Sequence, residues 1–324
     1  MRRIFPLLLI LLLLCGCGGN RDAAAPEDAD RLVIFPARSA AVYDDAVREF
    51  ERRTGIWVEV HTADGALPLL EQIAAGQRCD LLLGVTPDCL SACGELFAPY
   101  APEAAADIPG AYRDSEDRWT PFSLLPVVLI YNDQLVQRNV PDSWSSLTSS
   151  AWRGRIACPD PTVSATGCTA LEAMTQALDG EAEQVLADFV RCVGDVLPTA
   201  EDVVTAVADG RCYVGVTTED LAMQAASSGL SVTVIYPREG SVVQPDCAAI
   251  IADCAHEDNA RAFIDFLLSG EVQERLTRQY RRTVFTPPGD ASLPHALAYD
   301  PYAAGAHQAE TLDIWSSLTA EETP

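Results

Sequence analysis

The sequence predicts an α/β protein with two domains. Short apolar strands alternate with amphipathic helices from Leu32 onward, which is typical of a parallel sheet. About 290 residues follow the export segment and its linker, more than one typical core of about 100 to 200 residues. The segment 152–178 reads as strand, loop and helix, and its loop carries the polar residues that a ligand site needs.

The first residues predict export and a lipid anchor. Two arginines precede the apolar run 4–14, which is too short to cross a bilayer core of about 30 Å as a helix. The run ends in Leu-Cys-Gly-Cys, which resembles the bacterial lipobox, where cleavage precedes the cysteine that receives the lipid. We therefore expect 1–16 to be a signal peptide and Cys17 to anchor the protein on the outer face of the membrane or in the periplasm. An ordinary signal peptide cut nearby is the alternative.

Residues 17–31 are polar and rich in Ala, Asp and Glu, so they bury too little apolar surface to fold and should form a flexible tether. The whole chain is acidic as well, with 22 basic and 47 acidic residues and a formal net charge of −25 at pH 7. This charge excludes nucleic acid as a partner. An anionic ligand would have to be held by local dipoles and a few arginines.

Eleven cysteines fit an exported protein, because disulfides persist outside the cytoplasm. Cys158 and Cys168 flank the loop of 152–178, and Cys247 and Cys254 flank a short apolar strand, so we predict one local disulfide within each pair. Cys89 and Cys93 lie one helical turn apart, near the limit for a disulfide, and buried free thiols are the alternative there. The chain has no Cys-x-x-Cys motif and its four histidines show no ligand spacing, so we expect no metal site and no other cofactor.

The first domain should present ligand groups at the ends of its strands. Strands at 32–35, 57–60 and 81–83 alternate with helical patterns, and in such sheets ligands bind at the carboxyl ends of the strands. The polar side chains available there are Arg38, Ser39, Asp64 and Thr86. Arg38 could hold an anion through two N–H groups, and a solvated surface arginine is the alternative.

The second domain should hold the anion itself. In 152–178, Ser164, Thr166 and Gly167 would place amides and hydroxyls at the positive end of a helix, where carboxylate, phosphate or phosphonate oxygens bind. The alternative is that Ser164 or Thr166 only caps the helix. A later strand, 213–216, ends at Thr-Thr-Glu-Asp, 217–220, whose side chains could receive hydroxyls or an ammonium group, or cap the following helix.

Five motifs together resemble one known family. They are Ser-Trp-x-x-Leu at 143–147, Trp-x-Gly-x-Ile at 152–156, Asp-Pro-x-x-Ser-x-x-Gly at 160–167, the run at 259–269, and the pair Arg281-Arg282. In this order they resemble the type II periplasmic binding proteins over about residues 32–318. More narrowly they are similar to the branch that includes ferric-ion, phosphonate and sugar-phosphate receptors of ABC importers.

The resemblance implies a ligand cleft between two α/β lobes joined by crossovers near 123–127 and 242–249. Lobe 1 would comprise 32–124 and 243–285, lobe 2 would comprise 125–242, and the C-terminal helices of 286–324 would pack on lobe 2. The ligand contacts that it implies are Arg38, Ser39, Asp64, Gly65, Thr86, Ser123, Ser164, Ala165, Thr166, Gly167, Thr217, Glu219 and Asp220.

The function implied is binding, without catalytic residues. A monomeric lipoprotein would capture a small organic anion, such as a phosphonate, sugar phosphate or carboxylate, and deliver it to an ABC permease. The ferric-ion members carry paired tyrosines where this chain has 217–220, so a ferric-ion receptor that uses carboxylates or a bound anion is the alternative. A hydrolase with Ser164 or a cysteine as nucleophile has no Gly-x-Ser-x-Gly motif to support it. A scaffold lipoprotein would not need polar groups at so many strand ends.

Overall fold

The computed structural model describes residues 28–38, 42–62, 65–291, 293–297 and 299–322. The predicted signal peptide, Cys17, most of the predicted tether, Ser39 and Asp64 therefore lie outside the described residues. Within the described part of the chain, no helix combines the length and the apolar character needed to span a bilayer.

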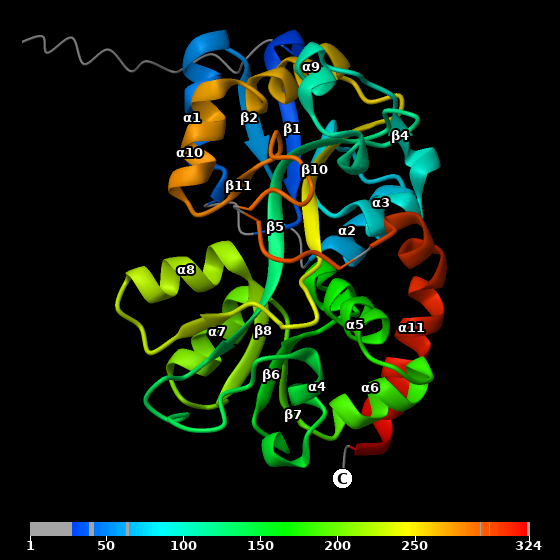
Figure 1. The fold of residues 1–324 in the computed structure, drawn as a ribbon. Helices are drawn as coiled ribbons and strands as arrows, with labels where there is room; N and C mark the ends of the chain where they lie inside the picture. Colours follow the sequence, from blue (N-terminus) through cyan, green and yellow to red (C-terminus); the bar gives the residue numbers. More distant parts are fainter. Residues whose placement is uncertain (1–27, 39–41, 63–64, 292, 298, 323–324) are drawn as a thin grey trace, which may run out of the picture.

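Two lobes share one long strand, β5 (Thr120–Tyr131) (Figure 1). The first lobe contains β1 (Arg31–Pro36), α1 (Asp44–Thr54), β2 (Trp57–Val60), α2 (Ala66–Ala74), β3 (Leu81–Val85), α3 (Pro87–Ser91), β4 (Phe97–Ala98), β10 (Val243–Ile251), α9 (Glu257–Leu267), α10 (Gly270–Arg278) and β11 (Arg282–Thr283). The second contains α4 (Trp144–Leu147), β6 (Ile156–Pro159), α5 (Ala165–Ala177), α6 (Ala182–Val190), β7 (Val193–Leu197), α7 (Ala200–Ala208), β8 (Val214–Thr218), α8 (Glu219–Ser227) and β9 (Thr233–Ile235).

The strand order is β2-β1-β3-β10-β5-β8-β6-β7, and β5 is the point where the two halves meet. Its residues up to Pro126 pair antiparallel with β10, and its residues from Val127 onward pair antiparallel with β8. β1, β2 and β3 are parallel in the first half, as are β6, β7 and β8 in the second. The apolar run of β3 is buried along its whole length, as expected for a parallel strand covered on both faces. The α/β class expected from the sequence is confirmed.

The C-terminal helix α11 (Pro301–Glu322) bridges the lobes (Figure 1). It packs against α5 and α6 of the second lobe, where Trp315 enters the apolar core. It also packs against α3 of the first lobe, so its contacts extend beyond the second lobe, on which the sequence placed it. Gly305 permits this approach, because a Cβ at that position would lie 2.6 Å from the carbonyl oxygen of Asp88.

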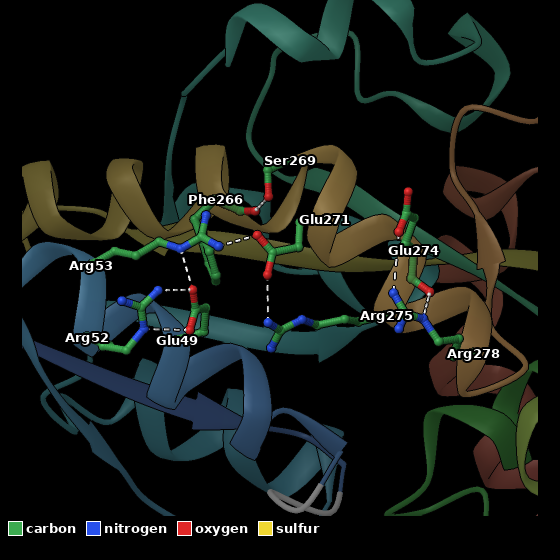
Figure 2. A network of polar contacts seen from close by, with 9 residues as sticks. All are labelled: Glu49, Arg52, Arg53, Phe266, Ser269, Glu271, Glu274, Arg275 and Arg278. Atoms are coloured by element: carbon green, nitrogen blue, oxygen red, sulfur yellow. Dashed lines mark hydrogen bonds and ion pairs between the residues drawn. The ribbon is translucent and has the colours of Figure 1, made fainter.

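A network of exposed ion pairs joins α1 to α10 on the surface of the first lobe (Figure 2). Glu49 accepts hydrogen bonds from Arg52 at 2.9 and 2.6 Å and from Arg53 at 2.6 Å. Arg53 also pairs with Glu271, whose other oxygen accepts from Arg275 at 2.6 Å. Because water screens these charges, the network adds little to stability.

The two disulfides expected from the sequence are absent from the structure, in which the nine cysteines among the described residues are free thiols. Cys158 lies in the apolar core of the second lobe, whereas the thiol of Cys168 donates to the carbonyl of Pro161 at 3.0 Å. Cys247 belongs to the apolar cluster that contains α2 and α3, whereas Cys254 packs against the separate cluster that contains α9. Closeness along the chain did not bring either pair of sulfur atoms together.

Candidate ligand-binding site

A cavity of about 650 Å³ lies between the two lobes. This volume is within the range of about 300 to 1,000 Å³ that small-molecule sites occupy. The first lobe lines it with Pro36, Ala37, Arg38, Thr62, Gly65, Ala66 and Gly84, and the second with Val163, Ser164, Ala165, Thr166, Pro198, Thr199, Ala200, Glu201 and Asp202. These residues lie at or just after the carboxyl ends of β1, β2, β3, β6 and β7, where parallel sheets bind ligands.

Three helices begin at this cavity. The first residues of α2, α5 and α7 all line it, so the positive ends of three helix dipoles meet there. Ser164 caps α5 by accepting from the Gly167 N–H at 3.4 Å, and Thr199 caps α7 by accepting from the Asp202 N–H at 3.0 Å. The sequence left open whether Ser164 caps a helix or faces a ligand, and in the structure it caps α5 and also lines the cavity.

Gly65 brings the lobes into close contact at one side of the cavity. Its φ of 123° is favoured only for glycine, and a Cβ there would lie 3.1 Å from the carbonyl carbon of Val163 and closer still to its oxygen. The start of α2 therefore touches the loop that leads into α5, and a side chain at this position would push the two lobes apart.

Arg38 is the cationic side chain of the cavity lining, and it is largely buried. Its Nε lies 3.4 Å from the carboxylate of Asp246 on β10. Burial alone would lower the pKa of Arg38, but Asp246, Tyr43 and Asp220 together outweigh it and the pKa is raised above its ordinary value. The guanidinium thus stays charged and is oriented by a buried carboxylate.

Arg281 lies at the centre of a buried charge cluster behind Arg38. Its Nη1 donates to Asp246 at 2.5 Å and to Ser123 Oγ at 3.3 Å, and its Nε lies 3.4 Å from Asp220. Tyr43 donates to Asp246 at 3.2 Å, and its ring packs 5.5 Å from the Arg281 guanidinium. Burial would lower the pKa of Arg281, but Tyr43 and the two aspartates raise it. Each charge in this cluster has an opposite partner, as burial requires.

The four polar residues at 217–220, which end β8 and begin α8, bond within the protein. Thr217 donates to the carbonyl of Ala200 at 3.1 Å, and Thr218 donates to Asp220 at 2.5 Å. Glu219 lines a separate cavity of about 380 Å³ between the lobes, together with Tyr236, Arg281 and Arg282. Thr86 and Ser123 are buried and lie outside the lining of the 650 Å³ cavity. Gly167 is also outside that lining, and its N–H donates to the Ser164 cap.

Several lining residues were not selected from the sequence. Thr199, Glu201 and Asp202 follow β7 as the Ser164 loop follows β6, so the same strand-end rule would have found them. Asp246 carries no local signal, because it lies inside a strand and acts through residues far away in the sequence. Across the described ranges, no group of three or more His, Cys, Asp or Glu side chains is arranged to hold a metal ion.

Comparison with known proteins agrees with this architecture. The profile of the family described as bacterial extracellular solute-binding protein matches residues 94–302. A probable ABC transporter periplasmic-binding protein of Sinorhizobium fredii is 25% identical over 291 residues, covering 86% of this chain and 79% of that protein.

Solved structures show the same two-lobed fold. The periplasmic binding protein AfuA of Actinobacillus pleuropneumoniae, with fructose-6-phosphate bound, superposes with a TM-score of 0.83 at 19% identity, covering 90% of this chain and 98% of that one. The ferric ion-binding protein A of Pasteurella haemolytica superposes with a TM-score of 0.76 at 15% identity, covering 91% of this chain and 99% of that one. The chain therefore belongs to the family of bacterial extracellular solute-binding proteins, and it is a two-lobed binding protein, not an enzyme.

Proposed function

We propose that the protein is the solute-binding component of an ABC importer and captures a small organic anion that also carries hydroxyl groups. The observation that carries this proposal is the convergence of three helix starts and Arg38 on one cavity between the lobes. Its relative in Sinorhizobium fredii is named as an ABC transporter periplasmic-binding protein, which supports a membrane permease as the partner. A lipid on Cys17 would keep the monomer at the membrane that holds this permease.

The start of α5 is the proposed anion site. The first N–H groups of a helix have no partner within the helix, and those of Ala165 and Thr166 lie at the cavity. The Ser164 oxygen accepts the Gly167 N–H, which leaves its own hydroxyl hydrogen able to donate to a ligand oxygen. Arg38 supplies charge from the opposite lobe. A phosphate, phosphonate or carboxylate group would thus be bound by donors from both lobes.

The start of α7 favours a different part of the ligand. Glu201 and Asp202 bring two carboxylates to this side of the cavity, and one oxygen of Asp202 already accepts from Thr199 at 2.7 Å. Carboxylates accept hydrogen bonds from hydroxyl or ammonium groups and repel a second anionic group. Among the three anion classes, a sugar phosphate satisfies both sides of the cavity. The bound fructose-6-phosphate of AfuA supports the same class.

Two measurements test the proposal. Native mass spectrometry of freshly purified protein should reveal a retained small molecule. A thermal-shift screen and isothermal titration should then compare sugar phosphates, phosphonates, simple carboxylates and ferric citrate. We expect the hydroxylated phosphates to bind tightest. Preferential binding of ferric citrate would favour the ferric-ion alternative, and hydrolysis of a phosphoester substrate would refute a pure binding role.

A further inference from the structure

We propose that Cys89 and Cys168 form a disulfide that joins the two lobes of the exported protein. Cys89 lies in α3 of the first lobe, and Cys168 lies in the first turn of α5 in the second lobe. Both sulfur atoms accept from the same Nε2 of Gln308 in α11, each at 3.5 Å, so they lie at most 7.0 Å apart. Rotation of the two side chains toward each other, with displacement of the Gln308 amide, would bring them into bonding range.

The surrounding contacts keep these two segments together. Ala165, at the start of α5, packs into the apolar cluster of the first lobe that also contains Cys89. The helix α11 packs on α3 and α5 at the same place, with Gln308 between the two thiols. The two sulfur atoms therefore lie at a contact between the lobes that packing maintains without a disulfide.

The extracellular location of the family favours a disulfide between Cys89 and Cys168. The family to which the chain belongs is extracellular, and disulfides persist outside the cytoplasm. In the reaction, the two thiols exchange with one disulfide of an oxidant of the thiol–disulfide type. The S–S bond of that oxidant breaks, a bond between the Cys89 and Cys168 sulfur atoms forms, and the two protons leave with the two thiols of the reduced oxidant.

The bond should form during folding. Burial raises the pKa of the Cys89 thiol and of the Cys168 thiol well above the ordinary value of 9.0, so little reactive thiolate exists once this contact has formed. Both side chains are also shielded from solvent in the folded chain. Reduced, folded protein should therefore resist oxidation, whereas unfolded protein should pair these two cysteines as it folds.

The consequence is a covalent link close to the ligand site. Cys168 lies one helical turn after Ser164, so the bond would fix the start of α5 to the first lobe. It would also close a loop of about 80 residues, which stabilises the folded state mainly by restricting the unfolded chain.

Peptide mapping tests the pairing directly. Full-length protein exported by a bacterial host is extracted without reductant, denatured with iodoacetamide and digested. We expect one linked pair of peptides that contains Cys89 and Cys168, two hydrogens lighter than the reduced pair and absent after reduction. Alkylation of Cys89 or Cys168 in this sample would overturn the proposal, and so would a link from Cys168 to Cys158.

Thermal unfolding provides a second readout. Wild-type protein that is reduced in urea and refolded with dithiothreitol should have a Tm about 5 to 10 °C lower than the oxidised protein. Cys89→Ala should already have the lower Tm and show no further shift, whereas the control Cys192→Ala should keep the shift, because Cys192 is buried elsewhere and donates to the Ser149 carbonyl at 3.2 Å. An unchanged Tm after this unfolding, reduction and refolding of the wild-type protein would contradict the bond. Should Cys89→Ala fail to fold, the wild-type peptide map decides alone.

Discussion

The guanidinium of Arg282 donates two hydrogen bonds of 2.6 Å to the carboxylate of Glu219. This pair links β11 of the first lobe to the start of α8 in the second, and the Tyr236 hydroxyl donates to the same carboxylate. Burial, together with Glu219, raises the pKa of Tyr236 to about 12, so the phenol remains protonated and able to donate. The lobes are thus tied together by protein groups alone at a distance from the proposed anion site.

Loss of this pair should destabilise the protein. In Glu219→Gln the amide cannot accept two charged hydrogen bonds, which leaves the Arg282 charge half-buried without its carboxylate. We expect a loss of about 1 to 3 kcal/mol in the free energy of unfolding, measured with urea. The control Glu274→Gln removes an exposed i,i+4 pair with Arg278 and should change little. Equal effects of the two substitutions would show that the Glu219 pair is screened like a surface pair.

Ser164→Ala should weaken ligand binding about ten- to hundredfold, because a hydrogen bond to a charged group contributes about 1.5 to 3 kcal/mol. It should also cost about 1 kcal/mol of stability through loss of the α5 cap. Ser143→Ala is the matched control, since Ser143 caps α4 at 3.2 Å outside the cavity. Isothermal titration with the identified ligand should show unchanged affinity for the control. Unchanged affinity in Ser164→Ala would place the anion elsewhere.

Gly65→Ala should hinder the approach of the two lobes. The added Cβ would overlap the Val163 carbonyl at a φ of 123°, so both strain and a clash between the lobes are expected. Gly76→Ala is the control, with a φ of 94° and no atom within 4 Å of the added Cβ. Both variants should lose stability, but only Gly65→Ala should bind ligand more weakly. Similar affinities would mean that the contact at Val163 does not limit closure.

Two buried aspartates should respond to pH in opposite directions. Burial raises the pKa of Asp88 above its ordinary 3.8, so its contribution to stability falls as the pH rises through 3.8 toward the folded-state value. Asp88→Asn should therefore gain stability relative to wild type between pH 4 and 7. Burial would also raise the pKa of Asp114, but hydrogen bonds from Arg118 and Tyr302 lower it. The stabilisation that ionised Asp114 provides is present above pH 3.8 and is lost as the pH falls below that value.

The control for this prediction is Asp114→Asn, which should lose stability relative to wild type, and more so at pH 7 than at acid pH. Urea unfolding at a series of pH values measures both differences. A difference between Asp88→Asn and wild type that does not change with pH would contradict the raised pKa.

Cys17→Ser should release the protein from the membrane fraction, because the lipid is expected on that thiol. Cys15→Ser is a matched control that changes the other cysteine of the same motif and should leave the protein anchored. Fractionation and immunoblotting give the result. A Cys17→Ser protein that stays with the membrane would favour an ordinary signal peptide and another mode of attachment.

The features that the sequence determined by itself are those that depend on residues close together in the chain. Short apolar runs and apolar residues at helical spacing predicted the α/β class, and strand ends predicted where ligand groups gather. The cap at Ser164 could be predicted because its hydroxyl acts on an N–H only three residues away. Arg38 could also be identified from the sequence, because it comes just after a largely buried strand.

The tertiary structure alone decided which partners these groups meet. Glu219 was expected to contact the ligand, yet it pairs with Arg282, 63 residues away, and Arg38 is oriented by Asp246, 208 residues away. Cys247 and Cys254 follow the same rule, because they pack into two different apolar clusters of the first lobe although they are close in the chain. Such contacts depend on how distant segments pack, and no local pattern of the sequence records that packing.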